Sequence, residues 1–163
     1  MLARFGVPAD VLELEITESD IMADPERAAE VCNRLHGIGI ELALDDFGAG
    51  YSSLAYLKRL PVGQIKIDKS FVLGMSQDAD DDTIVKSTID LGHNLGFTVV
   101  AEGVETLETS NRLTQLGCHL AQGFLVAKPM PGPHVIPWLN EFTELPLTQR
   151  FDGSILDADA VRG

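Results

Sequence analysis

Segments typical of β-strands alternate with segments typical of α-helices along most of this sequence of 163 residues. Each strand-like segment is a short apolar run, and a helical pattern follows it. Such alternation favours an α/β fold in which parallel strands are joined by right-handed helical crossovers. The five expected strands lie at residues 11–16, 41–47, 64–68, 97–104 and 118–127.

The expected helices carry recognisable start and stop signals. Pro25 stands in the first turn of the first helix, Gly96 ends the longest one, and Thr106 is a candidate N-cap of the fourth. The pattern fades near the end of the chain, so residues 143–163 are expected to form a loosely structured tail. The five expected helices cover residues 24–39, 51–60, 80–96, 106–117 and 131–142.

The charge of the chain limits its partners. The formal net charge is −13, and the isoelectric point is near 4.5. Such an acidic chain repels a phosphate backbone, so binding of DNA or RNA through a basic face is not expected. An anionic small molecule could bind only where cations mediate the contact.

Hydropathy and cysteine usage favour a cytoplasmic chain. No apolar run approaches the roughly 18 residues of a membrane helix, and no signal-peptide pattern opens the sequence. The two cysteines, Cys32 and Cys118, are far apart and form no CxxC pair, so we expect free thiols in a reducing compartment. We therefore expect no membrane contact by this chain, although a longer parent protein could carry an anchor.

A charged or amide side chain stands at or near the end of each expected strand. Because the carboxyl ends of parallel strands meet at one edge, these side chains are predicted to converge on one face. Four carboxylates and a lysine are not an ordinary core, since unpaired acids raise one another's pKa values. The residues concerned are Glu15, Asp45, Asp46, Lys66, Glu102 and Gln122.

The adjacent pair of Asp45 and Asp46 predicts divalent cations. Carboxylate oxygens suit Mg²⁺ or Mn²⁺ better than zinc. Neighbouring residues point to opposite faces of a straight strand. If the strand ends between the two aspartates, both can turn inward and hold two metals, with one of the aspartates bridging them. Two such ions are typical of in-line displacement at phosphorus, and Lys66 would add a positive charge near the attacking water or the departing phosphate.

Other interpretations of these residues stay open. Any one of the acids alone could cap a helix or solvate a loop. Glu18 could serve the helix that follows it, and Glu105 the helix that begins at Thr106. An enolase-type barrel would hold one magnesium ion and use a lysine as base, but the contiguous pair of Asp45 and Asp46 before a glycine loop counts against it.

Five stretches resemble, in order and spacing, the motifs of EAL-domain cyclic di-GMP phosphodiesterases: "LELEITES", "LALDDFGAGYSSLAYLKRLP", "QIKIDKSFV", "VVAEGVET" and "GCHLAQGFLVAKPMP". The resemblance begins near residue 8 and ends near residue 142, so residues 1–142 are identified as a partial EAL domain. It implies a TIM-like (β/α) barrel. It also implies metal-dependent hydrolysis of cyclic di-GMP, a bacterial second messenger, to linear pGpG.

The resemblance implies roles for the residues that match its motifs. Glu15 resembles a ligand of the first of two divalent cations, and Asp45 resembles the bridging ligand. Asp46 and Glu102 resemble ligands on the second metal's side, and Glu102 is also implied as the general base. Lys66 resembles the lysine that holds the attacking water or the phosphate.

Three more residues acquire roles in the same way. Gln122 and Glu105 resemble groups that orient water and metal ligands, and Gln122 is, with Lys66, an expected substrate contact. Glu18 resembles the glutamate that anchors the "DDFGAGYSS" loop, which in the family helps to coordinate metal binding with dimerisation. The resemblance therefore implies a homodimer through the loop and helix of residues 47–60.

The sequence lacks part of the family pattern. No Glu-Ala-Leu motif and no matching asparagine precede Glu15, and a complete barrel needs about 250 residues. We therefore expect an incomplete barrel of about five strand-helix units that lacks half of the first metal's ligands. The predicted function is a cyclic di-GMP phosphodiesterase that is impaired as a separate chain. The alternative is a non-catalytic, degenerate EAL module that binds a ligand or a partner.

Overall fold

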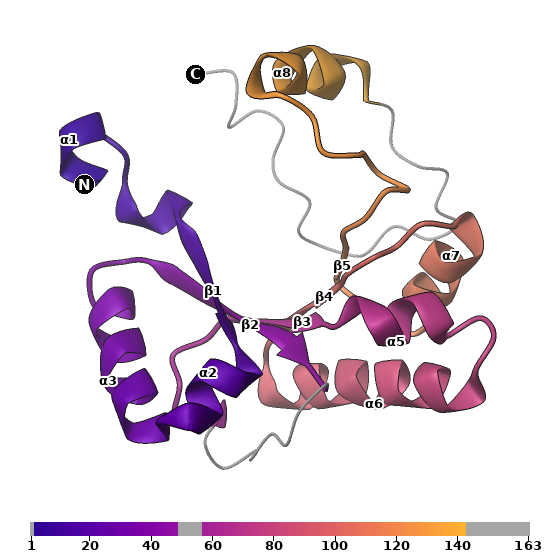
Figure 1. The fold of residues 1–163 in the computed structure, drawn as a ribbon, viewed down its shortest axis with the longest axis horizontal. Helices are drawn as coiled ribbons and strands as arrows, with labels where there is room; N and C mark the ends of the chain where they lie inside the picture. Colours follow the sequence, from indigo (N-terminus) through magenta and orange to yellow (C-terminus); the bar gives the residue numbers. More distant parts are fainter. Residues whose placement is uncertain (1, 49–56, 143–163) are drawn as a thin grey trace.

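A computed structural model describes residues 2–48 and 57–142 of the chain. In these residues, five strands form one parallel sheet in the order β1-β2-β3-β4-β5, so that each strand pairs with the next strand in the sequence (Figure 1). The strands are β1 (Glu13–Thr17), β2 (Glu41–Phe47), β3 (Gln64–Ile67), β4 (Thr98–Ala101) and β5 (Leu120–Ala121).

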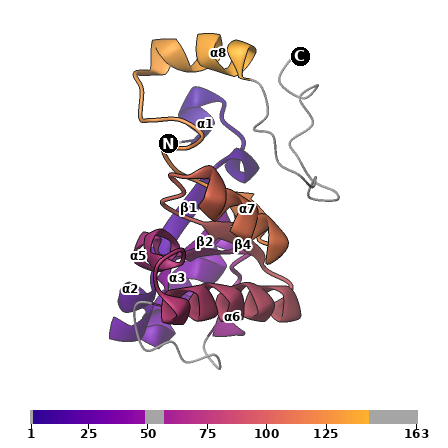
Figure 2. The same ribbon diagram turned by 90° about the vertical axis from the view of Figure 1, so that its right-hand side faces the viewer.

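Helices connect the strands and cover one side of the sheet. Figures 1 and 2 show α3 and α6 on that side, whereas α1 and α8, at the two ends of the described chain, stand apart on the other side. The elements are α1 (Leu2–Phe5), the 3₁₀ turn η1 (Ala9–Val11), α2 (Glu18–Ala23), α3 (Pro25–His36), α5 (Lys69–Gly74), α6 (Ala79–Leu95), α7 (Leu107–Gln115) and α8 (Gly132–Glu141).

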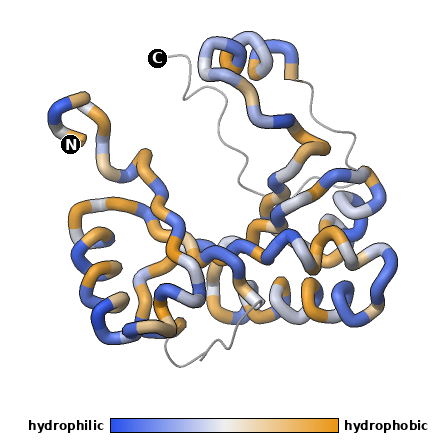
Figure 3. Tube along the Cα trace, viewed as in Figure 1, coloured by the Kyte–Doolittle hydropathy of each residue, from blue (hydrophilic) through white to orange (hydrophobic). Residues whose placement is uncertain are grey.

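The hydrophobic core lies between the sheet and its helix layer. Leu42 and Leu44 of β2 and Ile65 and Ile67 of β3 alternate with residues of the opposite face, and all four are at most 2% exposed. They pack with residues of α3 and α6, such as Ile89, in a single cluster. Figure 3 shows apolar positions recurring along the helices of this layer. The other face of the sheet is therefore free to carry polar side chains.

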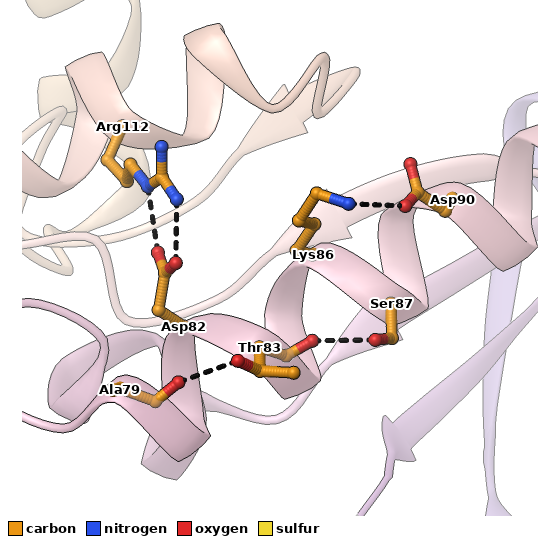
Figure 4. A network of polar contacts seen from close by, with 7 residues as sticks. All are labelled: Ala79, Asp82, Thr83, Lys86, Ser87, Asp90 and Arg112. Atoms are coloured by element: carbon orange, nitrogen blue, oxygen red, sulfur yellow. Dashed lines mark hydrogen bonds and ion pairs between the residues drawn. The ribbon is translucent and has the colours of Figure 1, made fainter.

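Polar contacts fix the start of α6 and join it to α7. Thr83 and Ser87 donate their hydroxyl groups to the backbone carbonyls one turn earlier (Figure 4). The guanidinium of Arg112, on α7, donates two hydrogen bonds to the carboxylate of Asp82, over 2.8 and 2.6 Å. This two-pronged contact ties together helices that follow consecutive strands.

The predicted α/β alternation and parallel sheet are confirmed, with differences in detail. Three short helices, α1, α2 and α5, were not predicted, because segments of four to six residues are too short to show a helical period. The last strand is much shorter than the expected 118–127, since the chain bends at Gly123, where a side chain would collide with the backbone of Val104. The expected helix at 51–60 falls largely on residues 49–56, and the expected tail on 143–163; both stretches lie outside the described residues.

No helix in the described part of the chain has both the length and the apolar character that a membrane crossing requires.

Candidate metal-dependent active site

Lys66 lies at the centre of the sheet, on the middle strand β3, and only 3% of its surface is exposed. Its two neighbours in the strand belong to the core, so side-chain alternation directs Lys66 to the opposite face. Its Nζ lies 2.5 Å from Oε1 of Glu15, 2.5 Å from Oε1 of Glu102 and 3.6 Å from Oδ1 of Asp45. One buried ammonium thus meets three carboxylates.

These three carboxylates come from three different strands. Glu15 belongs to β1, Asp45 to β2, and Glu102 directly follows β4. Glu15 and Lys66 lie near the ends of their strands and not at the last residue, because β1 extends to Thr17, paired with Asp45, and β3 continues for one residue beyond the lysine. The predicted convergence on one face nevertheless holds for all four side chains.

The strand β2 does not end between Asp45 and Asp46. The strand continues to Phe47, but its register with β3 shifts after Leu44, and Asp46 adopts a left-handed backbone with φ of 54°. Such an irregularity changes the direction of the side chains in a strand. A positive φ costs a non-glycine residue roughly 1–2 kcal/mol, and aspartate is one of the residue types that tolerate it. Both aspartates are partly buried.

The neighbouring carboxylates stabilise the positively charged form of Lys66. Burial by itself would lower the pKa of this lysine. Hydrogen bonds to Glu102 and Glu15, together with the negative charges of Glu102 and Asp45, outweigh burial and raise the pKa above its ordinary value. Lys66 is therefore an ammonium ion throughout the neutral range.

Asp46 and Asp68 form a second, linked pair of carboxyl groups. Burial, a hydrogen bond with Asp68 and the charges of Asp45, Asp68 and Glu102 raise the pKa of Asp46. Burial acts in the same direction on Asp68, but hydrogen bonds from the side chain and backbone N–H of Ser70 outweigh it and lower the pKa of Asp68. Asp46 is therefore the carboxyl that takes up a proton first as the pH falls.

The oxygen donors of this face fit a divalent cation. Carboxylates are the ligands that Mg²⁺ and Mn²⁺ prefer, and the buried Oδ1 of Asp45 has no hydrogen-bond partner among the described residues. In residues 2–48 and 57–142, no three His, Cys, Asp or Glu side chains are grouped so as to hold one ion as they stand. The lysine ammonium lies among three of the carboxylates there.

Glu18 lies beside this face, buried in the first turn of α2. The cap of α2 is Thr17, whose hydroxyl accepts a hydrogen bond from the N–H of Asp20. Glu18 instead accepts, through Oε2, the backbone N–H of Gly48 over 3.3 Å. Its side chain therefore contacts the first glycine after β2, where the expected loop begins; residues 49–56 of that loop lie outside the described part of the chain.

Glu105 and Gln122 lie near the same edge of the sheet, but their side chains are exposed. Glu105 precedes Thr106, which caps α7 by accepting the N–H of Thr109. The backbone of Gln122 is held by two hydrogen bonds: its N–H donates to the carbonyl of Ala101, and its carbonyl accepts from the N–H of Val104. Within the described residues, neither side chain is brought into contact with Lys66.

A family comparison determines the class of this site. Residues 1–129 match the EAL domain family, which covers most of the chain. The chain belongs to the EAL domain family.

Three proteins illustrate the similarity of this EAL domain to known relatives. RocR of Pseudomonas aeruginosa, named a cyclic di-GMP phosphodiesterase, is 41% identical over 140 residues, which cover 86% of this chain and 36% of RocR. The c-di-GMP complex of the PaMucR phosphodiesterase has a TM-score of 0.80 at 43% identity, over 82% of this chain and 54% of that chain. The manganese and cyclic di-GMP complex of BlrP1 from Klebsiella pneumoniae at pH 6 has a TM-score of 0.72 at 39% identity, over 78% of this chain and 33% of that chain. The chain thus spans about a third of RocR and a third to a half of the two chains in the solved structures.

Asp68 is the residue of this EAL-domain site that sequence reasoning missed. It directly follows β3, caps α5 by accepting the N–H of Ser70 over 2.8 Å, and interacts with Asp46. The signal was present, since aspartate is one of the residue types preferred at a helix N-cap. It was missed because residues 69–74 were not recognised as a helix.

Proposed function

We propose that this chain supplies the lysine and carboxylate part of the active site of a metal-dependent phosphodiesterase that opens cyclic di-GMP to linear pGpG. One observation carries the proposal: the buried ammonium of Lys66 contacts carboxylates from three strands on the polar face of the sheet. The names of RocR and PaMucR, both phosphodiesterases of cyclic di-GMP or in complex with it, support this substrate.

Two divalent cations, Mg²⁺ or Mn²⁺, are the proposed cofactors. Glu15, Asp45, Asp46 and Glu102 would hold them through carboxylate oxygens. Bound cations of this kind lower the pKa of a coordinated water and neutralise charge on a phosphate. The manganese complex of BlrP1 supports this class of metal.

The chain's own residues have distinct proposed tasks. Glu102 accepts the proton of the attacking water as general base, and Lys66 donates a hydrogen bond from its ammonium to that water or to the phosphate. Gln122 and Glu105, exposed at the same edge, orient water and metal ligands, and Gln122 also contacts the substrate. Glu18 holds the start of the loop after β2, and the 47–60 region forms the homodimer contact.

The activity of the separate chain is expected to be low. The chain covers 54% of the PaMucR structure, so groups outside it would complete the site. The same observation favours the second candidate, a non-catalytic EAL module that binds cyclic di-GMP or a partner. We keep residues 1–142 as the partial EAL domain and residues 143–163 as its tail in both cases.

The test is an assay of the purified chain with cyclic di-GMP and either MgCl₂ or MnCl₂, in which pGpG is quantified by chromatography. We expect slow, metal-dependent turnover that Asp45→Asn abolishes and that Asp10→Asn, which removes an exposed carboxylate, leaves unchanged. Calorimetric binding of cyclic di-GMP without turnover would favour the binding module. Turnover as fast as that of a full-length relative would refute the proposed impairment, and neither binding nor turnover would overturn both candidates.

A further inference from the structure

Two side chains of β3 reach across the neighbouring strand β2 to glutamates of β1. Lys66 forms its ion pair with Glu15 over 2.5 Å, and Gln64, two positions earlier on the same face, donates from Nε2 to Oε1 of Glu13 over 3.1 Å. Glu13 in turn stands two positions before Glu15 on β1. The two contacts therefore run side by side. The uncharged Gln64–Glu13 contact lies two residues closer to the amino ends of the strands than the Lys66–Glu15 ion pair.

Ala43 makes both contacts possible. It pairs in register with Glu15 on one side and with Gln64 on the other, so it lies on β2 directly between the two bridged strands. It is fully buried and carries only a methyl group on this face. Any longer side chain at this position would occupy the space over β2 that the two bridging side chains cross.

The hydrogen bond from Gln64 to Glu13 bears on which carboxylate pairs with Lys66. Glu13 and Glu15 share one face of β1, about 7 Å apart along the strand, and either carboxylate could pair with the single ammonium of Lys66. Glu13 is exposed and stands in register with another acid, Glu41, and like charges directly opposite each other in a sheet are unfavourable. Within the described residues Glu13 has no ion-pair partner, and its donor is the uncharged amide of Gln64.

We propose that Gln64 is a positioning residue for Lys66: by holding the carboxylate of Glu13, it removes a competitor for the ammonium and keeps Lys66 on Glu15 and Glu102. The effect of this positioning on catalysis rests on the proposed function, whereas the positioning of Lys66 by Gln64 does not. Without the amide, Glu13 draws the ammonium toward the amino ends of the strands and away from Glu102.

The test follows the side-chain NH₃⁺ resonance of Lys66 by ¹H–¹⁵N NMR of the full chain, without metal or substrate. A buried, ion-paired ammonium exchanges slowly enough to be seen, and Lys66→Met assigns the signal by its loss. We expect Gln64→Ala to shift this resonance. Glu13→Gln alone should leave it in place, and Glu13→Gln in combination with Gln64→Ala should restore it, because the competing charge is then gone.

This rescue separates positioning from a merely structural role. In the turnover assay, Gln64→Ala is expected to lower the rate about tenfold or more, since a displaced catalytic group costs at least that, and the double variant should recover most of the loss. If Gln64→Ala does not fold, Gln64→Met, of similar length but with no hydrogen to donate to Glu13, should shift the resonance in the same way.

Three results would overturn the proposal: a wild-type chain without a slowly exchanging Lys66 signal, a signal that neither Gln64 variant shifts, or a shift that Glu13→Gln does not reverse. A chain that shows the shift and its reversal but no turnover would refute the proposed function and support the positioning by Gln64. Ala43→Val, which leaves all four bridging residues in place, should shift the Lys66 signal as well, and an unshifted signal in this variant would count against the bridging geometry.

Discussion

Lys66 and Glu102 form an ion pair of 2.5 Å between neighbouring strands. The backbone fixes this contact, because Lys66 is in register with Val100 and the N–H of Glu102 donates to the carbonyl of Ile67 over 3.3 Å. The glutamate therefore lies two positions beyond the residue that pairs with the lysine, at the carboxyl edge of the sheet. The carboxylate of Glu102 therefore depends on the ammonium of Lys66 for its counter-charge.

The first prediction is that Lys66→Met destabilises the chain at neutral pH. Removing one partner of a buried ion pair leaves the other charge uncompensated, at a cost of 3–5 kcal/mol for fully buried pairs. The carboxylate of Glu15 is 47% exposed, so we expect a smaller loss of about 2 kcal/mol in the free energy of unfolding. Urea denaturation followed by circular dichroism measures this loss.

The pH dependence of that loss has a definite sign. The pKa of Lys66 is raised in the folded chain, so its stabilising effect is fully present below the ordinary lysine pKa of about 10.4 and declines only above it. The difference between wild type and Lys66→Met should be the same at pH 7 and pH 9. Lys86→Met, which removes an exposed lysine paired with Asp90, should cost less than about 0.5 kcal/mol; an equal loss in both variants would contradict the argument.

The order of the strands could be predicted from the sequence because its signals are local. Apolar runs and helix caps such as Thr106 and Gly96 recur at regular intervals, and parallel strands joined by helices leave few topologies. The three short helices and the early end of β5 could not be predicted. Gly123 marks that end through its close contact with Val104, and such a contact exists only after the chain has folded.

The active-site residues also divide into those whose position could be predicted from the sequence and those whose position could not. The meeting of Glu15, Asp45, Lys66 and Glu102 could be predicted, since topology alone brings their strands together. The left-handed turn at Asp46 depends on a register shift between β2 and β3, which no local pattern announces. The side-chain positions of exposed residues, such as Gln122, depend on contacts rather than on topology and were not predictable either.

The second prediction is that Asp46→Asn stabilises the chain at pH 7. The raised pKa of Asp46 means that its ionised form is disfavoured in the folded chain, and asparagine tolerates the positive φ of this position. The destabilising effect is absent below the ordinary aspartate pKa of about 3.9 and grows as the pH rises through the folded pKa. Thermal unfolding should give a higher Tm for the variant at pH 7, with the gain vanishing near pH 3.5.

A matched control for this variant is Asp10→Asn, which removes an exposed carboxylate of η1. It should leave the Tm unchanged at both pH values, since surface substitutions of this kind have small effects. If Asp46→Asn is less stable than wild type at pH 7, the repulsion among the carboxylates is not the dominant effect at this position.

The third prediction concerns the contact between α6 and α7 (Figure 4). Hydrogen bonds from Arg112 hold the pKa of Asp82 below its usual value, so the pair stabilises the chain above pH 4 and this contribution is lost as the pH falls through the folded pKa. Asp82→Asn should therefore lower the urea midpoint at pH 7, and the effect should shrink as the pH is lowered below 4. Asp90→Asn, which breaks an exposed contact with Lys86 on the same helix, should change the midpoint less, and a pH-independent effect of Asp82→Asn would argue against the ion pair.

The fourth prediction is that Gly92→Ala destabilises the chain although alanine is the better helix former. A methyl group at this position of α6 would meet Cγ2 of Val99, and it would lie 3.2 Å from Cδ1 of Ile65. Both neighbours are fully buried and β-branched, so neither can rotate away easily. Overpacking costs about 1–3 kcal/mol, against a helix-propensity gain of up to about 1 kcal/mol, so a net loss in the free energy of unfolding is expected from urea denaturation. Gly132→Ala, where the added methyl group meets nothing within 4 Å, should be neutral, and a Gly92→Ala chain as stable as wild type would mean that α6 can move off the sheet without loss.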